Sequence, residues 1–213
     1  SILFEGAQGT SLDIDHGTFP FVTSSSTVAG NAALGSGVGP TDIKKVIGIA
    51  KAYTTRVGSG PFPTELGDAT GKYLQEKGHE FGTTTGRIRR CGWFDLVVLN
   101  HARRVNGLTS LVLTKLDVLS GLKELKVCVS YELAGKEIHT LPSAHQQLTL
   151  CKPKYVSLPG WEEDLTAAKS WDDLPKNAQS YVEFIEDQLK IKIDSVSVGP
   201  ERPQFILRKN PFI

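Results

Sequence analysis

The sequence lacks the cysteine patterns that define several common classes of protein. It contains only three cysteines, Cys91, Cys128 and Cys151, and they are widely spaced. A disulfide framework or a zinc site normally shows closer cysteine pairs. We therefore expect reduced, partly buried thiols, which suits a cytoplasmic protein.

Long apolar runs and an excess of one charge are also missing. No stretch approaches the roughly 20 apolar residues that span a bilayer, and no basic leader precedes an apolar stretch. The 24 basic and 23 acidic side chains leave a net charge of +1. We expect neither a membrane nor a nucleic acid as partner, and any anion must be bound by local clusters.

Several catalytic signatures are absent as well. There is no G-x-x-x-x-G-K-S/T sequence, which disfavours a self-contained P-loop GTPase. There is no G-x-S-x-G elbow, and no cysteine–histidine pairing stands out. A phosphate-transferring centre is therefore not evident in these 213 residues.

The chain opens on an apolar run, Ile2–Glu5, whose pattern predicts a buried strand. Natural termini usually fray at the surface, so a core strand at the very start suggests a fragment of a longer protein. A trimmed or differently processed terminus remains the alternative.

Helical and strand patterns alternate along the chain. Apolar spacing predicts helices from Thr41 through Ala50, over 70–77 and 95–106, and a late helix that includes 178–189. Strands are expected at 108–113, 196–198 and 205–207, and a hairpin joins 127–133 to 138–141. This alternation favours an α/β fold with a largely parallel sheet flanked by helices, and the hairpin forms an antiparallel accessory part.

The tetrapeptide Thr114-Lys115-Leu116-Asp117 closes a predicted strand, where open α/β sheets bind their ligands. An aspartate there can accept two hydrogen bonds from guanine, whereas adenine presents the wrong pattern. The lysine stem can lie along the purine ring. The tetrapeptide resembles the guanine-reading Asn/Thr-Lys-x-Asp element of GTP-binding proteins, although so short a pattern also arises by chance.

Two further loops could serve the same site. Ser197-Val198-Gly199-Pro200 ends a predicted strand and could offer backbone donors and acceptors to the base, or it is an ordinary strand-to-turn junction. The segment 81–90 combines two glycines, three threonines and several arginines. Such a turn can bind a carboxylate or phosphate, and a solvated basic turn is the alternative.

The early segment is less informative. Gln8 follows the first predicted strand and carries an amide that can both donate and accept. Asp13, Asp15 and His16 match no metal-ligand spacing, so a satisfied hydrogen-bond cluster is the preferred interpretation. The serine-rich stretch from Thr23 could hold a phosphate, but such loops are common.

Several longer strings, taken together and in order, resemble the adenylosuccinate synthetase family. The resemblance covers nearly the whole chain and is weakest over 134–173. The strings are Glu5-Gly6-Ala7-Gln8-Gly9-Thr10, Asp13-Ile14-Asp15-His16-Gly17-Thr18-Phe19-Pro20, Val22-Thr23-Ser24-Ser25, Arg56-Val57-Gly58, Gly60-Pro61-Phe62-Pro63-Thr64-Glu65, Thr84-Thr85-Gly86-Arg87, Thr114-Lys115-Leu116-Asp117-Val118-Leu119 and Gly199-Pro200.

The resemblance implies a P-loop-NTPase-like synthetase, a carbon–nitrogen ligase of AMP biosynthesis that is typically a homodimer. GTP, the co-substrate, phosphorylates the 6-oxygen of IMP. The amine of L-aspartate then displaces that phosphate, giving adenylosuccinate, GDP and phosphate, with Mg²⁺ assisting the phosphoryl transfer.

The resemblance also implies roles for individual residues. The IMP-binding set is Gln8, Thr23, Val57 and Arg87. The aspartate-binding set is Thr83, Thr84, Thr85, Gly86, Arg87 and Arg89. The GTP-binding set is Arg89, Lys115, Leu116, Asp117, Ser197, Val198 and Gly199.

The departure from the family is large. Its GDEGKG phosphate loop, catalytic aspartate, catalytic histidine and magnesium ligands match nothing here, and His16 does not take the histidine's place. We therefore expect residues 1–213 to be the carboxyl-terminal portion of one synthetase domain, with 1–120 as substrate loops and sheet and 121–213 as hairpin, helix and guanine-site strands. We expect no activity from the chain alone. A non-catalytic guanine-nucleotide-binding module is the alternative.

Overall fold

The computed structural model describes residues 2–82 and 86–210. Its central sheet has the strand order β1-β5-β9-β10. Strands β1 (Ile47–Lys51), β5 (Ser110–Thr114) and β9 (Ile193–Ser197) run parallel, while β10 (Phe205–Leu207) is antiparallel to β9. The fold is therefore α/β with a mixed, mostly parallel sheet, as the alternation of patterns predicts.

A second sheet forms the antiparallel accessory part. Its longest strand, β6 (Leu122–Leu133), pairs with β7 (Lys136–Ile138) and along most of its length with β8 (Lys152–Trp161). The short strand β4 (Phe94–Asp95) lies parallel to β6. The hairpin is thus confirmed, with its turn at Ala134 and Gly135, but β6 begins five residues earlier than expected and β8 was not predicted.

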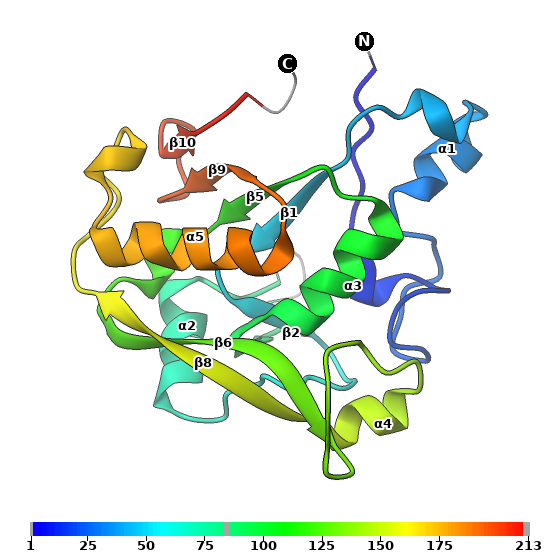
Figure 1. Cartoon of the computed structure of the whole chain (residues 1–213), viewed down its shortest axis with the longest axis horizontal. Coiled ribbons are helices and arrows are strands. Elements are labelled where there is room, and N and C mark those ends of the chain that lie inside the picture. The colour runs from blue at the N-terminus through cyan, green and yellow to red at the C-terminus, as the bar shows by residue number, and fades with distance from the viewer. Residues whose placement is uncertain (1, 83–85, 211–213) are drawn as a thin grey trace.

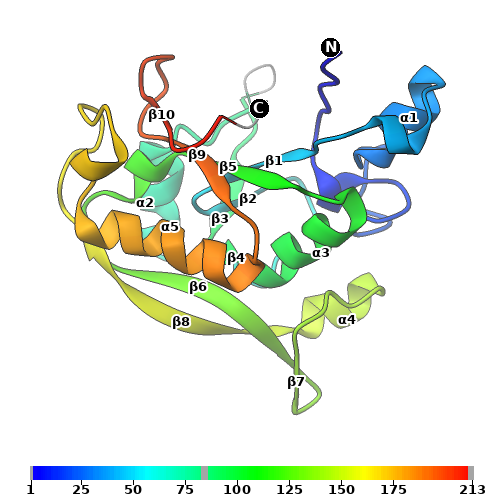
Figure 2. The ribbon, with the colours of Figure 1, turned by 45° about the horizontal axis from the view of Figure 1, so that its top comes forward.

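Two helices lie between the sheets, as Figures 1 and 2 show from two directions. Helix α5 (Lys176–Leu189) buries Tyr181, Val182 and Ile185, and α3 (Leu96–Asn106) packs against β6. Helix α3 has the start and stop signals expected from the sequence. The Asp95 carboxylate accepts hydrogen bonds from the N–H groups of Val97 and Val98, and Gly107 ends α3 in the left-handed region.

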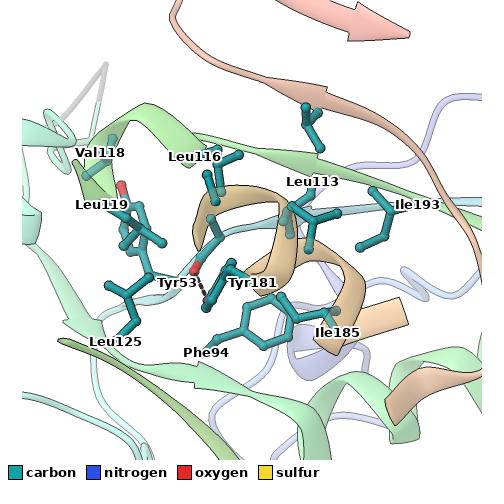
Figure 3. Close-up of a cluster of buried hydrophobic side chains, with 14 of the residues drawn as sticks. Tyr53, Phe94, Leu113, Leu116, Val118, Leu119, Leu125, Tyr181, Ile185 and Ile193 are labelled. Atoms are coloured by element: carbon teal, nitrogen blue, oxygen red, sulfur yellow. Dashed lines mark hydrogen bonds between the residues drawn. The ribbon is translucent and has the colours of Figure 1, made fainter. Parts of the chain in front are cut away.

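The main hydrophobic core joins the central sheet, α5 and the second sheet. Leu111 and Leu113 of β5, Ile185 of α5 and Leu125 of β6 are all fully buried in it. Figure 3 shows Tyr53 and Tyr181 in the same cluster, and the Tyr181 hydroxyl donates a hydrogen bond to the Ala52 carbonyl at 2.7 Å. This core fixes the strand ends that carry the polar residues described below.

The remaining elements are short. They are helices α1 (Gly30–Ser36), α2 (Ala69–Lys77) and α4 (His145–Leu150), the paired strands β2 (Thr54–Val57) and β3 (Arg89–Gly92), and four 3-10 turns at Thr10–Leu12, Pro40–Asp42, Leu116–Leu119 and Trp171–Asp173. The α2 prediction is confirmed, with Gly78 after its last residue. No helix among the described residues is long and apolar enough to cross a bilayer.

Two local predictions are wrong. The Ile2–Glu5 segment forms no strand: Ile2 and Leu3 are 78% and 76% exposed, and no described strand pairs with them. The helix expected from Thr41 is instead a 3-10 turn followed by β1. Its β-branched Val46, Ile47 and Ile49 favour a strand, and pairing with β5 outweighs the helical spacing.

Candidate functional site

The carboxyl ends of the three parallel strands bring polar residues to one edge of the central sheet. Lys51 is the last residue of β1, Lys115 directly follows β5, and Ser197 is the last residue of β9. Lys51 pairs in register with Thr114, and Leu113 pairs with Val196. The three strands therefore end at the same height along the strand direction. Open α/β sheets bind their ligands at this edge.

Lys115 and Ser197 are in direct contact. The backbone N–H of Lys115 donates a hydrogen bond to Ser197 Oγ at 2.9 Å. Lys115 adopts the left-handed region with φ 62° and so turns the chain from β5 into the 3-10 turn Leu116–Leu119. The structure therefore brings together the tetrapeptide and the Ser197 turn, two loops that the sequence analysis assigned to one site.

Asp117 lies in that turn with part of its carboxylate buried and unpartnered. Among the described residues, nothing forms a hydrogen bond with Asp117 Oδ1, although this atom is shielded from solvent. Burial raises the pKa of Asp117, and Lys115 and Lys77 act in the opposite direction. A buried acceptor without a donor is costly, so this oxygen is suited to a ligand that brings an N–H group. The neighbouring Leu116 side chain is fully buried in the core instead.

Glu80 is a fully buried carboxylate at the centre of this edge. Both of its oxygens accept hydrogen bonds from Lys51 Nζ at 2.8 Å, and one accepts from the Tyr53 hydroxyl. Arg89 Nη1 lies 2.9 Å from Oε2, and Lys115 Nζ lies 3.1 Å from Oε1. Burial alone would raise the pKa of Glu80, but the hydrogen bonds from Lys51, Tyr53 and Arg89 lower it to about 2.

The arginine-bearing loop starts beside Glu80 and returns as β3. The Gly82 N–H donates to the Arg87 carbonyl and the Gly86 N–H donates to the Gly82 carbonyl, both at 2.7 Å. Gly86 has φ +63°, which a residue with a side chain adopts only under strain. Thr83, Thr84 and Thr85, expected to bind aspartate, lie outside the described residues.

One of the IMP candidates, Val57, approaches the same region through β2. Val57, at the end of β2, is 45% exposed and pairs in register with Arg89 of β3. The preceding residue, Arg56, reaches into the early segment, where its Nη2 donates to Thr18 Oγ1 at 2.9 Å and to the Phe21 carbonyl at 3.1 Å. The Arg56 guanidinium therefore joins β2, which carries Val57, to the loop before Thr23.

The loop that carries Thr23 is organised by a buried aspartate. Asp13 is fully buried and accepts hydrogen bonds from the backbone N–H groups of four residues and from the Ser26 hydroxyl; the four are Asp15, His16, Thr27 and Val28. Burial would raise the pKa of Asp13, but these backbone bonds lower it to about 2. The expected hydrogen-bond cluster is confirmed for Asp13.

Thr23 and Gln8, which the sequence analysis expected to bind IMP, are not joined to the strand-end residues by described contacts. The Thr23 N–H donates to the Leu12 carbonyl at 2.8 Å, which ties its backbone to the same loop. Gln8 is exposed and has φ 62°. No described contact joins either residue to Glu80, Lys115 or Arg89.

The turn after Ser197 is shaped by Gln204. The Val198 N–H donates to the Gln204 carbonyl at 2.9 Å, and Gln204 Oε1 accepts from the Glu201 N–H at 2.9 Å. A Cβ added to Gly199 would lie 2.1 Å from Gln204 Oε1. The Gln204 side chain packs directly on the Gly199 backbone, so a side chain at position 199 would require Gln204 to shift.

The sequence analysis gave no role to Glu80, Lys51 or Arg56. Charged residues are common in loops, and nothing local marks Glu80 as buried or Lys51 as its partner. The one available signal was the predicted strand end at Lys115, but β1 was read as a helix, so Lys51 was not placed beside it. Recognising β1 would have put both lysines at one sheet edge.

No group of three or more histidine, cysteine, aspartate or glutamate side chains within 2–82 and 86–210 could hold a metal ion. The Asp13 oxygens are already used by five donors, and Glu80 is surrounded by cations. These residues therefore do not fit Mg²⁺. The cysteines Cys91, Cys128 and Cys151 are free and buried, as expected.

The fold and the site together define an α/β domain whose polar loops converge beyond the carboxyl ends of parallel strands, where this class binds its ligands. Comparison with known proteins is more specific. A family model described as adenylosuccinate synthetase matches residues 1–206. The chain belongs to the adenylosuccinate synthetase family.

Its relatives include adenylosuccinate synthetases from Myxococcus xanthus and Nitratidesulfovibrio vulgaris, each 59% identical over 99% and 98% of this chain respectively. The match covers 48% and 49% of those proteins, so the chain spans about half their length.

Solved structures agree with this assignment. Fully ligated adenylosuccinate synthetase from Plasmodium falciparum superposes with a TM-score of 0.94 at 44% identity, covering 96% of this chain and 49% of that chain. A cyanophage S-2L succinoaminodeoxyadenylate synthetase matches with a TM-score of 0.56 at 18% identity, covering 97% of this chain and 46% of that chain, and supports the fold alone.

Proposed function

We propose that this chain supplies the guanine-binding and aspartate-binding surfaces of a synthetase that joins IMP and L-aspartate. In the proposed reaction, GTP phosphorylates the 6-oxygen of IMP and the aspartate amine displaces that phosphate. The products are adenylosuccinate, GDP and inorganic phosphate. Phosphorylation is needed because the 6-oxygen is a poor leaving group on its own.

One observation carries the guanine assignment. Asp117 presents a buried oxygen without a donor, beside a Lys115–Ser197 hydrogen bond that fixes the two loops around it. Guanine offers a ring N–H and an exocyclic amine, which suit a carboxylate with two oxygens. Adenine offers no such pair of donors, so it leaves the carboxylate unsatisfied. The Lys115 stem and the backbone of Val198 and Gly199 complete the proposed base site.

We assign the aspartate substrate to the loop 83–89 and to Arg89. The Arg89 guanidinium uses Nη1 for Glu80, and its planar fork of donors suits a carboxylate or a phosphate. Arg87 is assigned to both aspartate and IMP. Val57, paired with Arg89, is assigned to the ribose of IMP, Thr23 to its 5′-phosphate and Gln8 to the base near the reacting oxygen.

The remaining parts of the reaction are assigned elsewhere. We propose that the catalytic aspartate and histidine, the phosphate loop and the ligands of Mg²⁺ belong to the part of the synthetases that this chain does not span. The homodimer implied by the family and a cytoplasmic location are part of the same proposal, and the free, buried cysteines suit that compartment.

A binding measurement tests the base assignment directly. We expect the chain to bind GDP by isothermal titration calorimetry at least tenfold more tightly than ADP. Equal affinity for the two nucleotides, or no binding of GDP, would contradict a guanine site at Asp117.

A reconstitution tests the reaction. The chain is joined to the half of the Myxococcus xanthus relative that it does not span, and adenylosuccinate is followed by its absorbance with IMP, L-aspartate, GTP and Mg²⁺. We expect turnover by the hybrid and none by residues 1–213 alone. GDP binding by the chain without turnover by a folded hybrid would favour the non-catalytic guanine-nucleotide-binding module instead.

A further inference from the structure

Glu80 links two loops that the proposed function assigns to different ligands. Lys115 belongs to the guanine-reading tetrapeptide, and Arg89 belongs to the aspartate-binding loop. They are separated by 26 positions in the sequence, yet Lys115 Nζ and Arg89 Nη1 contact opposite oxygens of the same carboxylate, at 3.1 Å and 2.9 Å. The Glu80 side chain is fully buried, so it is not available to contact a ligand itself.

The backbone and side chain of Glu80 act on the same neighbours. The Arg89 N–H donates to the Glu80 carbonyl at 2.9 Å, so Arg89 is held at both its main chain and its guanidinium. Lys115 is likewise held at two ends, by Ser197 at its N–H and by Glu80 and the Gly78 carbonyl at its Nζ. Both ends of Lys115, its backbone N–H and its Nζ, are therefore held in place, two residues before Asp117 in the sequence.

The local charge explains why a carboxylate is needed. Three cations, Lys51, Arg89 and Lys115, contact one anion, and the side chains of the cations are 26%, 28% and 33% exposed. Without the anion, three like charges would be left close together at the rim of the sheet and would repel one another. Arg89 is the first residue of β3 and Lys115 directly follows β5, so each lies where a strand meets a loop.

We propose that Glu80 is a positioning residue that holds Lys115 and Arg89 in one frame, so that the guanine site and the aspartate site are formed together. This inference rests on the proposed function, because that function assigns the ligands of the two loops. It goes further by making a single buried carboxylate responsible for the affinity of both.

The test uses the chain of residues 1–213 and measures its affinity for GDP and for L-aspartate by calorimetry, together with its melting temperature. Glu80→Gln keeps the shape of the side chain but removes its charge. We expect both affinities to fall about tenfold, a typical coupling magnitude. The matched control is Glu76→Gln on α2, an exposed glutamate paired with Lys72, and it should leave both affinities unchanged.

A second variant separates positioning from simple destabilisation. Lys51 is assigned to no ligand, and its Nζ is occupied by Glu80 and Thr55. In Glu80→Gln with Lys51→Met, one buried anion and one cation are removed together, which restores the charge balance. We expect the melting temperature to recover toward native while both affinities stay low, because Lys115 and Arg89 still lack the anion whose two oxygens accept from both of them.

The outcomes are distinct. Native affinity for either ligand in the folded double variant would overturn the inference, since positioning by Glu80 predicts that both sites suffer. A Glu80→Gln chain that melts earlier but binds both ligands as native does would overturn it too. A native chain that binds neither ligand would contradict the proposed function itself, and the inference with it.

Discussion

The backbone N–H of Lys115 and the hydroxyl of Ser197 form a 2.9 Å hydrogen bond across 82 positions of sequence. It exists because β5 and β9 are parallel neighbours that end at the same sheet edge. Each residue alone belongs to a common kind of turn. Their contact brings the turn that carries Asp117 next to the end of β9, and the first prediction follows from that arrangement.

Asp117→Asn should change which base the site prefers. Guanine brings two donors to the carboxylate, whereas xanthine replaces the exocyclic amine by a carbonyl, which an asparagine amide can satisfy. We expect the affinity for GDP to fall about 100-fold and the affinity for xanthosine diphosphate to rise, measured by calorimetry. Asp187→Asn, an exposed aspartate paired with Lys190, should change neither affinity. Unaltered GDP binding in Asp117→Asn would place the base elsewhere.

Glu80 should make the fold sensitive to acid. Its pKa in the folded chain is about 2, below the ordinary value of 4.5. A depressed carboxyl pKa stabilises the fold above the unfolded value, and this stabilisation is lost as the pH falls from about 4.5 to 2. The loss amounts to about 3 kcal/mol over that window.

The measurement is urea unfolding at a series of pH values. Native chain should lose stability steeply below pH 4.5, whereas Glu80→Gln should be less stable above that pH, show a shallower slope in this window and approach the native curve near pH 2. Glu76→Gln should follow the native curve, because that glutamate is exposed. Parallel curves for native and Glu80→Gln would contradict the prediction.

Asp95 should give the stability of the fold the opposite dependence on pH. It is buried as the N-cap of α3, the Tyr131 hydroxyl donates to its Oδ2 at 2.6 Å, and burial raises its pKa to about 6. The folded state therefore holds the proton more tightly than the unfolded state does, so stability is lost as the pH rises from about 4 to 6. The difference is about 3 kcal/mol.

Asp95→Asn should remove this slope at a cost of about 1 kcal/mol, since asparagine is also a good N-cap. Thermal unfolding from pH 4 to 7 measures the change. Asp68→Asn, the exposed N-cap of α2, serves as the control and should keep the native pH profile. If Asp95→Asn retains the full slope, another group is responsible for it.

Asp13 should control the loop assigned to the phosphate of IMP. Asp13→Asn replaces one acceptor oxygen by an amide nitrogen facing the N–H groups of Thr27 and Val28, or those of Asp15 and His16. We expect a loss of about 2–4 kcal/mol of stability by urea unfolding and weaker IMP binding in the hybrid enzyme. Asp15→Asn, which is exposed, should have little effect on either measurement. Equal stability of the two variants would show that the loop does not depend on Asp13.

Much of this protein could be predicted because its signals are local. The cap at Asp95 and the left-handed Gly107 mark both ends of α3, and the apolar spacing of α5 identifies the helix that fills the core. The tetrapeptide ending in Asp117 was correctly placed at the end of a strand. Local rules succeed here because a cap or a buried face depends on residues within a few positions.

Other features were decided only by the tertiary structure. The residues of β1 have helical spacing, and they form a strand because β5 offers a parallel partner. Glu80 is an ordinary loop glutamate in the sequence, and it becomes a buried centre because Lys51, Arg89 and Lys115 converge on it from three separate elements. The sequence by itself determined the strand end that carries the tetrapeptide and the strand end that carries Ser197. Their meeting point depended on strand order, because contacts between distant residues form only when the whole sheet assembles.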